Sequence, residues 1–338
     1  MIIVMKPKAT QENIEHVVEK LHKYGLEAHL SQGKLVTIIG VIGDKAVLAN
    51  KNMELLPGVD KLIPVTETYK LVNRKFSDQN TVFKIKDIEI GGGNFTLIAG
   101  PCSIESEEQI FSTAKSLSEA GVKILRGGAF KPRTSPYSFQ GLGEEGLKLM
   151  EGAAKQFNMI TVSEVTSVYA LDIAEKYLDI IQIGARNMHN YELLKEVGRT
   201  HKPIFLKRGL SATIDEWLNA AEYIIRENNS KVILCERGIR TFETSTRNTL
   251  DISAVPVVKS KSHLPVFVDP SHASGVKEYI IPLARAAVAA DCDGLMVEVH
   301  PDPDQALSDG AQSLTPVEFM ELIKQIKPIV EIMRRKLR

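Results

Sequence analysis

From residue 95 onward, the chain repeats one pattern of hydrophobic and polar positions. A short apolar run rich in β-branched residues is followed by a loop with polar or charged residues, and then by a stretch with the periodicity of an amphipathic helix. Runs that are apolar on both faces and separated by helices are typical of a parallel sheet covered on its outer side. The predicted strands are 95–99, 123–126, 160–165, 179–183, 203–207, 231–235, 265–268 and 294–299. Eight such strands in about 240 residues match a closed (β/α)8 barrel, the TIM barrel, better than an open sheet.

The first 70 residues follow a different pattern. Their predicted elements are a strand at 2–5, a helix at 10–24, strands at 27–31 and 35–42, a helix at 45–55 and a strand at 59–64. This βαββαβ order is the ferredoxin-like pattern of a small α+β domain. We therefore predict a ferredoxin-like domain at 1–70, a linker and β-hairpin at 71–94, and a barrel at 95–338 whose last helix runs from Thr315 to Arg338.

Composition excludes several classes of partner. Lysine and arginine total 42, and aspartate and glutamate also total 42, so no net field attracts nucleic acid or an anionic membrane. No run is apolar and long enough for a signal peptide or a membrane span, which predicts a cytoplasmic protein. Three cysteines are an odd number and argue against a disulfide framework.

Cationic residues nevertheless gather where the predicted barrel strands end. They are Arg126, Lys131, Arg133, Arg186, Lys207 and Arg237. Barrel chemistry occurs at these carboxyl ends, where arginine and lysine bind phosphate and carboxylate groups. Any one of these residues could instead mark the point where the chain leaves the core for water. Six together favour a site for ligands that carry several anionic groups.

Four potential metal ligands also lie at strand ends. Cys102 follows the first strand, His272 the seventh and Glu298 ends the eighth, with Asp309 in the loop beyond. Because the first and eighth strands of a closed barrel are neighbours, these side chains can converge. One thiolate, one imidazole and two carboxylates suit a divalent Mn, Fe, Co or Zn ion without selecting among them. Taken singly, Cys102 could be a small buried hydrophobe and His272 a core histidine.

Seven segments carry a resemblance to a known family. They are 99–103 (AGPCS), 125–128 (LRGG), 131–135 (KPRTS), 182–187 (QIGARN), 207–209 (KRG), 236–238 (ERG) and 269–272 (DPSH). In this order they resemble 3-deoxy-D-arabino-heptulosonate 7-phosphate (DAHP) synthases of type Iβ. The resemblance implies the first step of the shikimate pathway toward aromatic amino acids, in which phosphoenolpyruvate, erythrose 4-phosphate and water give DAHP and phosphate.

The resemblance also implies roles for individual residues. Cys102, His272, Glu298 and Asp309 would bind the metal, and Arg133 and Thr134 would contact erythrose 4-phosphate. Glu164 and Lys131 are candidates for managing the reacting water and its protons. Phosphoenolpyruvate would be held by Arg126, Lys131, Arg186, Lys207 and Arg237, and by the backbone of Gly184 and Ala185.

For the first domain, the resemblance implies feedback regulation in a homotetramer. An aromatic amino acid, tyrosine or phenylalanine, would bind between two such domains. In the strand at 27–31, alternation directs His29 and Ser31 to one face, where both offer hydrogen bonds. The alternative is that this domain only builds the oligomer and that both side chains are solvated.

Two other functions are weighed against this one. Synthases of the eight-carbon analogue, which use arabinose 5-phosphate, share the barrel but have Ala-Asn-Arg-Ser after the lysine, where this chain has Pro-Arg-Thr-Ser. Residues 132–134 therefore favour the four-carbon aldose. A sugar-phosphate sensor without turnover would be expected to lack a catalytic residue, and none is missing.

Overall fold

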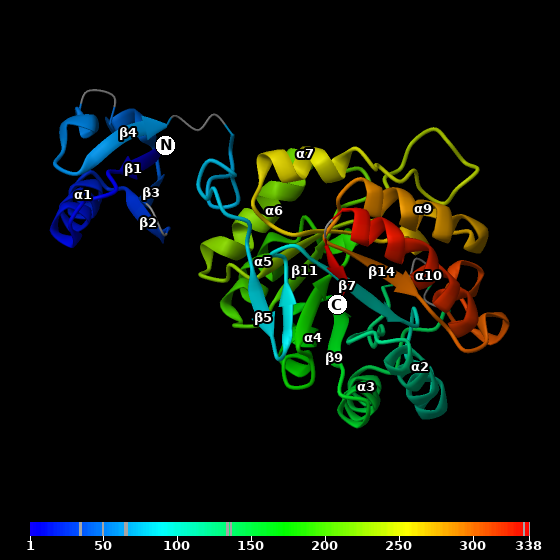
Figure 1. The fold of residues 1–338 in the computed structure, drawn as a ribbon. Helices are drawn as coiled ribbons and strands as arrows, with labels where there is room; N and C mark the ends of the chain where they lie inside the picture. Colours follow the sequence, from blue (N-terminus) through cyan, green and yellow to red (C-terminus); the bar gives the residue numbers. More distant parts are fainter. Residues whose placement is uncertain are drawn as a thin grey trace. The chain divides into compact units, whose positions relative to one another are not determined.

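The computed structural model describes residues 1–33, 36–48, 51–63, 67–132, 135, 137–333 and 335–337. The chain forms two compact units, each with its own core (Figure 1). One consists of Met1–Asn80 with Ser260–His263, and the other of Thr81–Lys259 with Leu264–Arg338. No helix among these residues is both long and apolar enough to cross a membrane.

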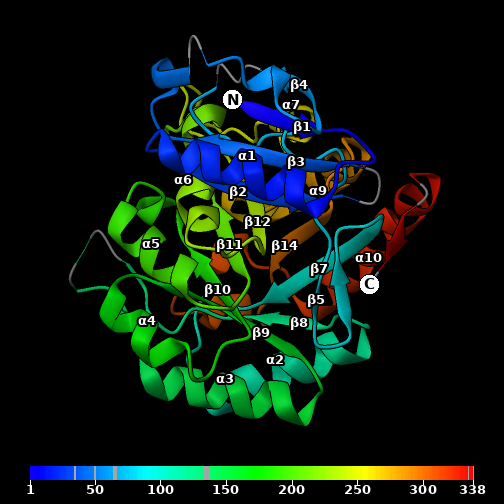
Figure 2. The same ribbon diagram turned by 90° about the vertical axis from the view of Figure 1, so that its left-hand side faces the viewer.

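The first unit is an antiparallel sheet in the order β2-β3-β1-β4, with α1 lying across one face (Figure 2). Its elements are β1 (Ile2–Met5), α1 (Gln11–Lys23), β2 (Glu27–Gln32), β3 (Thr37–Ile42), the 3-10 turns η1 (Lys45–Leu48) and η2 (Met53–Leu55), and β4 (Val59–Ile63). A capping box at Thr10 begins α1, which buries Ile14, Val17 and Leu21 in the core of this unit. The strand order confirms the ferredoxin-like prediction.

The predicted helix at 45–55 is wrong in its form. The structure has the two short turns η1 and η2 there. Asn52 adopts a left-handed backbone with φ of 45°, which an α-helix does not contain. The apolar residues of this segment still reach the core, since Leu48 and Met53 are buried. The hydrophobic pattern therefore identified the buried side chains but not the helix type.

The second unit is a closed parallel barrel, as predicted. Its strands are β7 (Asn94–Gly100), β8 (Ile124–Arg126), β9 (Ile160–Val165), β10 (Ile180–Ile183), β11 (Ile204–Lys207), β12 (Val232–Glu236), β13 (Val266–Val268) and β14 (Gly294–Glu298). Consecutive strands pair in parallel, and β14 pairs with β7 to close the ring. The helices are α2 (Glu107–Glu119), α3 (Glu144–Gln156), α4 (Val168–Ala174), α5 (Tyr191–Arg199), α6 (Ile214–Arg226), α7 (Ala254–Lys261), α8 (Pro270–Ser274), α9 (Lys277–Ala289) and α10 (Pro316–Ile332), with 3-10 turns η3 (Ala185–Asn187), η4 (Pro303–Gln305) and η5 (Gly310–Gln312).

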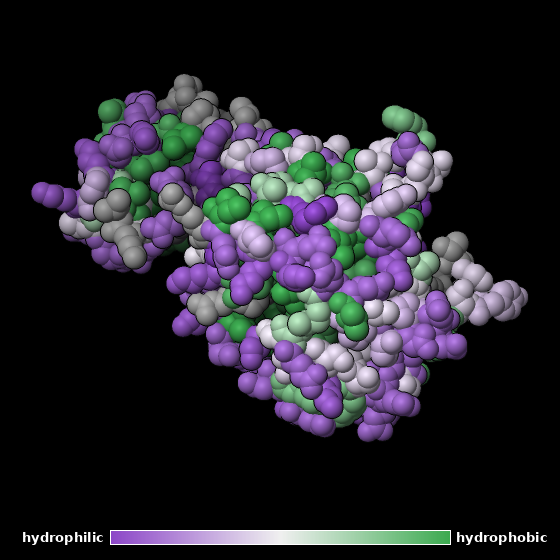
Figure 3. All heavy atoms as spheres, turned by 45° about the vertical axis from the view of Figure 1, so that its right-hand side comes forward, coloured by the Kyte–Doolittle hydropathy of each residue, from purple (hydrophilic) through white to green (hydrophobic). Residues whose placement is uncertain are grey.

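A hairpin of β5 (Phe83–Ile85) and β6 (Ile88–Ile90) packs into the barrel core. Its isoleucines share one buried cluster with interior residues such as Phe205 and Phe267. These apolar contacts close one end of the barrel. We therefore expect the functional site at the other end. On the outside, the face drawn in Figure 3 is mainly hydrophilic, with small separate hydrophobic patches.

The last helix begins as predicted and ends earlier. Thr315 caps α10 and Pro316 occupies its first turn. The helix ends at Ile332 instead of continuing to residue 338, and Lys336–Leu337 forms a short strand, β15, that pairs in parallel with the start of β7. Backbone pairing with β7 therefore holds residues 336 and 337 against the barrel.

Candidate active site

The carboxyl ends of the barrel strands surround a cavity of about 440 Å³. Two carboxylates, Glu164 and Asp309, and the imidazole of His272 line it together with many cations. The cationic lining residues are Arg126, Lys131, Arg186, Lys207, Arg237, Arg240 and Arg247. Five of the predicted cations are thus brought into one cavity, while Arg133 and Thr134 lie outside the described residues. Such a cavity fits small ligands with several anionic groups.

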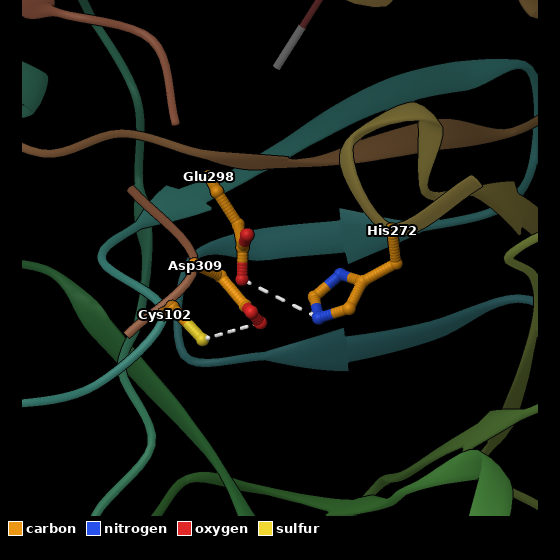
Figure 4. Close-up of side chains that lie close together, drawn as sticks. All are labelled: Cys102, His272, Glu298 and Asp309. Carbon is orange, nitrogen blue, oxygen red and sulfur yellow. Dashed lines mark hydrogen bonds and ion pairs between the residues drawn. The ribbon is translucent and has the colours of Figure 1, made fainter. Parts of the chain in front are cut away.

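The predicted metal ligands converge at this cavity (Figure 4). One potential ligand atom from each of Cys102, His272, Glu298 and Asp309 lies within 4.8 Å of the others. Cys102 Sγ is 3.2 Å from Asp309 Oδ2, and His272 Nε2 is 3.4 Å from Glu298 Oε1. This mixture of sulfur, nitrogen and oxygen donors fits a first-row divalent cation.

Asp269 fixes the orientation of His272. Its Oδ1 accepts the backbone N–H of His272 at 2.9 Å and so caps α8, while its Oδ2 lies 2.7 Å from His272 Nδ1. A proton on Nδ1 leaves Nε2 free to bind a metal, which is the usual arrangement of a histidine ligand. Burial lowers the pKa of His272 and favours this neutral ring.

Charged and polar groups hold the two carboxylates. Glu298 is fully buried; its Oε1 accepts from Arg126 Nη1 at 2.8 Å and its Oε2 from Gln312 Nε2 at 2.6 Å. Burial alone would raise the pKa of Asp309, but the positive charge around it, to which Arg247 contributes most, outweighs burial and lowers the value to about 2. Both side chains are therefore anionic near neutral pH, as cation ligands must be.

Cys102 and Lys131 form a close pair. Lys131 Nζ lies 3.0 Å from Cys102 Sγ and 2.9 Å from its carbonyl oxygen. Burial, with Glu298 nearby, raises the pKa of the Cys102 thiol to about 12. The thiolate therefore needs an additional positive charge beyond Lys131, and a bound divalent cation supplies one.

Glu164 is on β9 and lies beside the end of β10, where Gln182 is its partner in the strand register. A Cβ added to Gly184 would come within 2.0 Å of Glu164 Oε1, so a larger residue at this position would displace the carboxylate from where it lies. Gln182 Nε2 lies 3.4 Å from Glu164 Oε2. Gly184, Ala185 and Glu164 all line the cavity.

The sequence analysis missed several residues of this site, and four of them have charged or polar side chains that matter for the argument. They are Arg240, Arg247, Asp269 and Gln312. Asp269 stands in the segment 269–272 that carries the family resemblance, but the sequence analysis assigned it no role. Its Oδ2 also contacts Lys207 Nζ at 2.5 Å, so one carboxylate contacts both a candidate metal ligand and a candidate phosphate-binding lysine. The two arginines come from the loop between β12 and α7, beyond the strand end at which the sequence predicts site residues.

In the first unit, His29 and Ser31 are half-buried on β2. The ring of His29 meets Phe76 edge-on, with centroids 5.5 Å apart. Within the described part of the chain, His29 Nδ1 is a buried atom with no hydrogen-bond partner, and burial lowers the pKa of this histidine. An orphaned buried polar atom is rare and is consistent with a ligand contact.

Comparison with known proteins identifies relatives over the whole chain. Residues 69–333 match the model of the DAHP synthetase I family, and residues 1–67 that of the DAHP synthase ferredoxin-like domain. Phospho-2-dehydro-3-deoxyheptonate aldolase of Thermotoga maritima is 51% identical over 98% of both chains. Its crystal structure matches with a TM-score of 0.80 at 50% identity, covering 100% of this chain and 99% of that one. The 2-dehydro-3-deoxyphosphooctonate aldolase of Syntrophotalea carbinolica is 32% identical, covering 74% of this chain and 96% of its own.

Proposed function

Because the chain belongs to the DAHP synthetase I family, we propose roles for its cavity residues in that family's reaction. The enzyme joins phosphoenolpyruvate, erythrose 4-phosphate and water to give DAHP and phosphate, the first step of the shikimate pathway. The observation that carries the proposed roles is one cavity that is lined by seven cations and borders a four-residue metal-ligand cluster, two members of which, His272 and Asp309, line the cavity.

Phosphoenolpyruvate is bound by the cationic wall. Arg186, Lys207 and Arg237, with the backbone of Gly184 and Ala185, bind its phosphate and carboxylate groups. Arg126 also belongs to this wall, and its bond to Glu298 joins it to the metal ligands. The fixed positions of these cations orient C3 of the enol toward the aldehyde and so lower the entropic cost of the bimolecular step.

The condensation needs one proton donor and one proton acceptor beside the reacting carbons. C3 of phosphoenolpyruvate attacks the aldehyde carbon, water adds at C2, and phosphate leaves with cleavage of the C2–O bond. We assign Lys131 to donate a proton to the developing aldose oxygen and Glu164 to take one from the water. Support comes from their positions in the same cavity, with Lys131 beside Cys102 and Glu164 beside Gly184.

Cys102, His272, Glu298 and Asp309 would hold a first-row divalent ion, which when bound supplies Lewis-acid polarisation of the aldehyde oxygen. Asp269 keeps His272 Nε2 directed toward this cluster. Arg126 and Gln312 restrain Glu298 so that its carboxylate cannot rotate away.

A comparison of erythrose 4-phosphate with arabinose 5-phosphate as the second substrate tests this function. Recombinant enzyme should release phosphate from phosphoenolpyruvate with a kcat/KM at least about tenfold higher for erythrose 4-phosphate than for arabinose 5-phosphate. Higher identity to the DAHP synthase of Thermotoga than to the octulosonate enzymes supports this direction. Faster turnover of arabinose 5-phosphate would contradict the assignment, and no turnover with either aldose would favour a sensor.

For the first unit we propose feedback inhibition by tyrosine or phenylalanine, bound between two copies of the domain. Deleting residues 1–70 should leave an active enzyme that neither amino acid inhibits. The cut keeps Arg74, whose backbone N–H donates to Lys261 O at 2.7 Å. A truncated form of the Thermotoga enzyme, which matches 79% of this chain with a TM-score of 0.75, provides a precedent for a folded product.

The matched full-length variant is His29→Ala. It removes the orphaned Nδ1 while keeping the domain, so it should weaken inhibition and leave the uninhibited rate unchanged. Inhibition curves with each amino acid measure this. Unchanged inhibition in the truncated enzyme would refute the proposal, and unchanged inhibition in His29→Ala would refute the role of His29.

A further inference from the structure

Arg208 follows a cavity residue but does not line the cavity itself. Its side chain is only 5% exposed and makes three polar contacts. Nη1 lies 2.8 Å from both Glu236 Oε2 and Asp251 Oδ2, and Nε donates to the carbonyl of Ala212 at 3.0 Å. The guanidinium carbon also lies 5.9 Å from the ring of Trp217. Arg208 is therefore fixed on several sides.

These contacts connect two loops that carry cavity cations. Lys207, beside Arg208 at the end of β11, lines the cavity, and so does Arg237, beside Glu236 at the end of β12. Glu236 is fully buried, and its Oε1 accepts the backbone N–H of Gly238 at 2.7 Å. The same carboxylate thus holds Arg208 with one oxygen and the turn after Arg237 with the other.

The contact of Arg208 with Asp251 extends the connection to α7. Asp251 Oδ1 accepts the backbone N–H of Ala254 at the start of that helix, at 3.2 Å. A second link joins the same two loops, because the backbone N–H of Arg240 donates to Leu210 O at 2.7 Å. Leu210 and Arg240 both line the cavity. The β11 and β12 loops are therefore joined behind the cavity wall through Arg208, and at the wall itself through Arg240 and Leu210.

We propose that Arg208, through its bonds to Glu236 and Asp251, is a positioning residue that sets the spacing of Lys207 and Arg237 for phosphoenolpyruvate. This inference rests on the proposed function of the cavity. Two cations that face one ligand repel each other, so a rigid connection behind them is needed to keep them in place before the ligand arrives. The planar guanidinium of an arginine can contact two carboxylates and a carbonyl together. The ammonium group of a shorter lysine side chain cannot maintain all three contacts.

Arg208→Lys tests the proposal, with Arg335→Lys as the matched control. Arg335 is comparably buried, at 8% exposure, and also bridges two carboxylates, with 2.7 Å contacts to Asp291 and Asp293. Asp293 directly precedes β14, so this cluster lies at the opposite end of the barrel from the cavity. Both variants lose a buried arginine that joins two acids, but only Arg208→Lys should disturb the ligand.

Calorimetric titration with phosphoenolpyruvate and steady-state kinetics give the readouts. Arg208→Lys should raise the phosphoenolpyruvate Kd and KM by about 10- to 100-fold, the usual effect of removing a supporting contact, and leave the KM for erythrose 4-phosphate near the wild-type value. Arg335→Lys should lower the melting temperature without changing either KM. If Arg208→Lys does not fold, Glu236→Gln, which keeps the side-chain shape and removes the charge, takes its place.

Wild-type phosphoenolpyruvate affinity in a folded Arg208 or Glu236 variant would overturn the positioning role. An equal rise in both KM values would overturn it too, because that result indicates general loosening of the barrel. Failure of the wild-type enzyme to bind phosphoenolpyruvate would instead contradict the proposed function, so the two failures are distinguishable.

Discussion

Cys102→Ala is expected to abolish turnover by removing one of the four candidate metal ligands. Lewis-acid polarisation is worth several kcal/mol and each 1.4 kcal/mol is a factor of ten, so kcat should fall by about a thousandfold or more. The alanine also removes the contact between Sγ and Lys131 Nζ. Phosphate release and metal content per chain after desalting measure the two consequences.

Cys235→Ala is the matched control for this variant. Cys235 is also fully buried, but its thiol lies in the apolar barrel interior with Phe205 and Phe267. Its loss should reduce stability slightly and leave metal content and rate near wild type. A Cys102→Ala enzyme that keeps both its metal and its turnover would show that the cluster is not the metal centre.

Lys131→Met should reduce kcat by about 10²- to 10⁴-fold, the usual contribution of a positioned proton donor. Methionine keeps the length of the side chain and removes the ammonium group that lies 3.0 Å from Cys102 Sγ. Lys131→Arg should not restore the rate, because a guanidinium is larger and does not release its proton. Initial rates at saturating concentrations of both substrates separate this effect from weaker binding.

An exposed lysine controls for the loss of charge. Lys148 on α3 is exposed and forms an ion pair with the surface carboxylate of Glu144 at 3.6 Å, so Lys148→Met should leave the rate unchanged. A Lys131→Met enzyme with normal kcat and a raised phosphoenolpyruvate KM would assign Lys131 to binding alone and would remove it from the proton-transfer step.

Much of this site follows from the sequence because a local rule combines with a topological one. Periodicity identifies each strand, and barrel closure then brings the ends of β7 and β14 together. Cys102 and Asp309 are far apart in the chain, yet their convergence was predicted from strand order alone. The same reasoning placed Lys131, Arg186 and Arg237 on one cavity.

What the sequence could not provide depends on side-chain direction and on loop conformation. Lys207 and Arg208 are adjacent and both cationic, but one lines the cavity and the other turns behind it. Arg240 and Arg247 reach the cavity from an irregular loop, for which no periodicity exists. In the first unit, two 3-10 turns replace the predicted helix at 45–55, and Asn52 between them has a left-handed backbone that the hydrophobic pattern does not reveal.

Removal and return of the metal test the central claim most directly. Wild-type enzyme treated with a chelator and desalted should release no phosphate from phosphoenolpyruvate and erythrose 4-phosphate, and stoichiometric Mn²⁺ should restore the rate. The Cys102→Ala enzyme, treated in parallel, should not recover. Full turnover by wild-type enzyme that contains no metal would contradict the account.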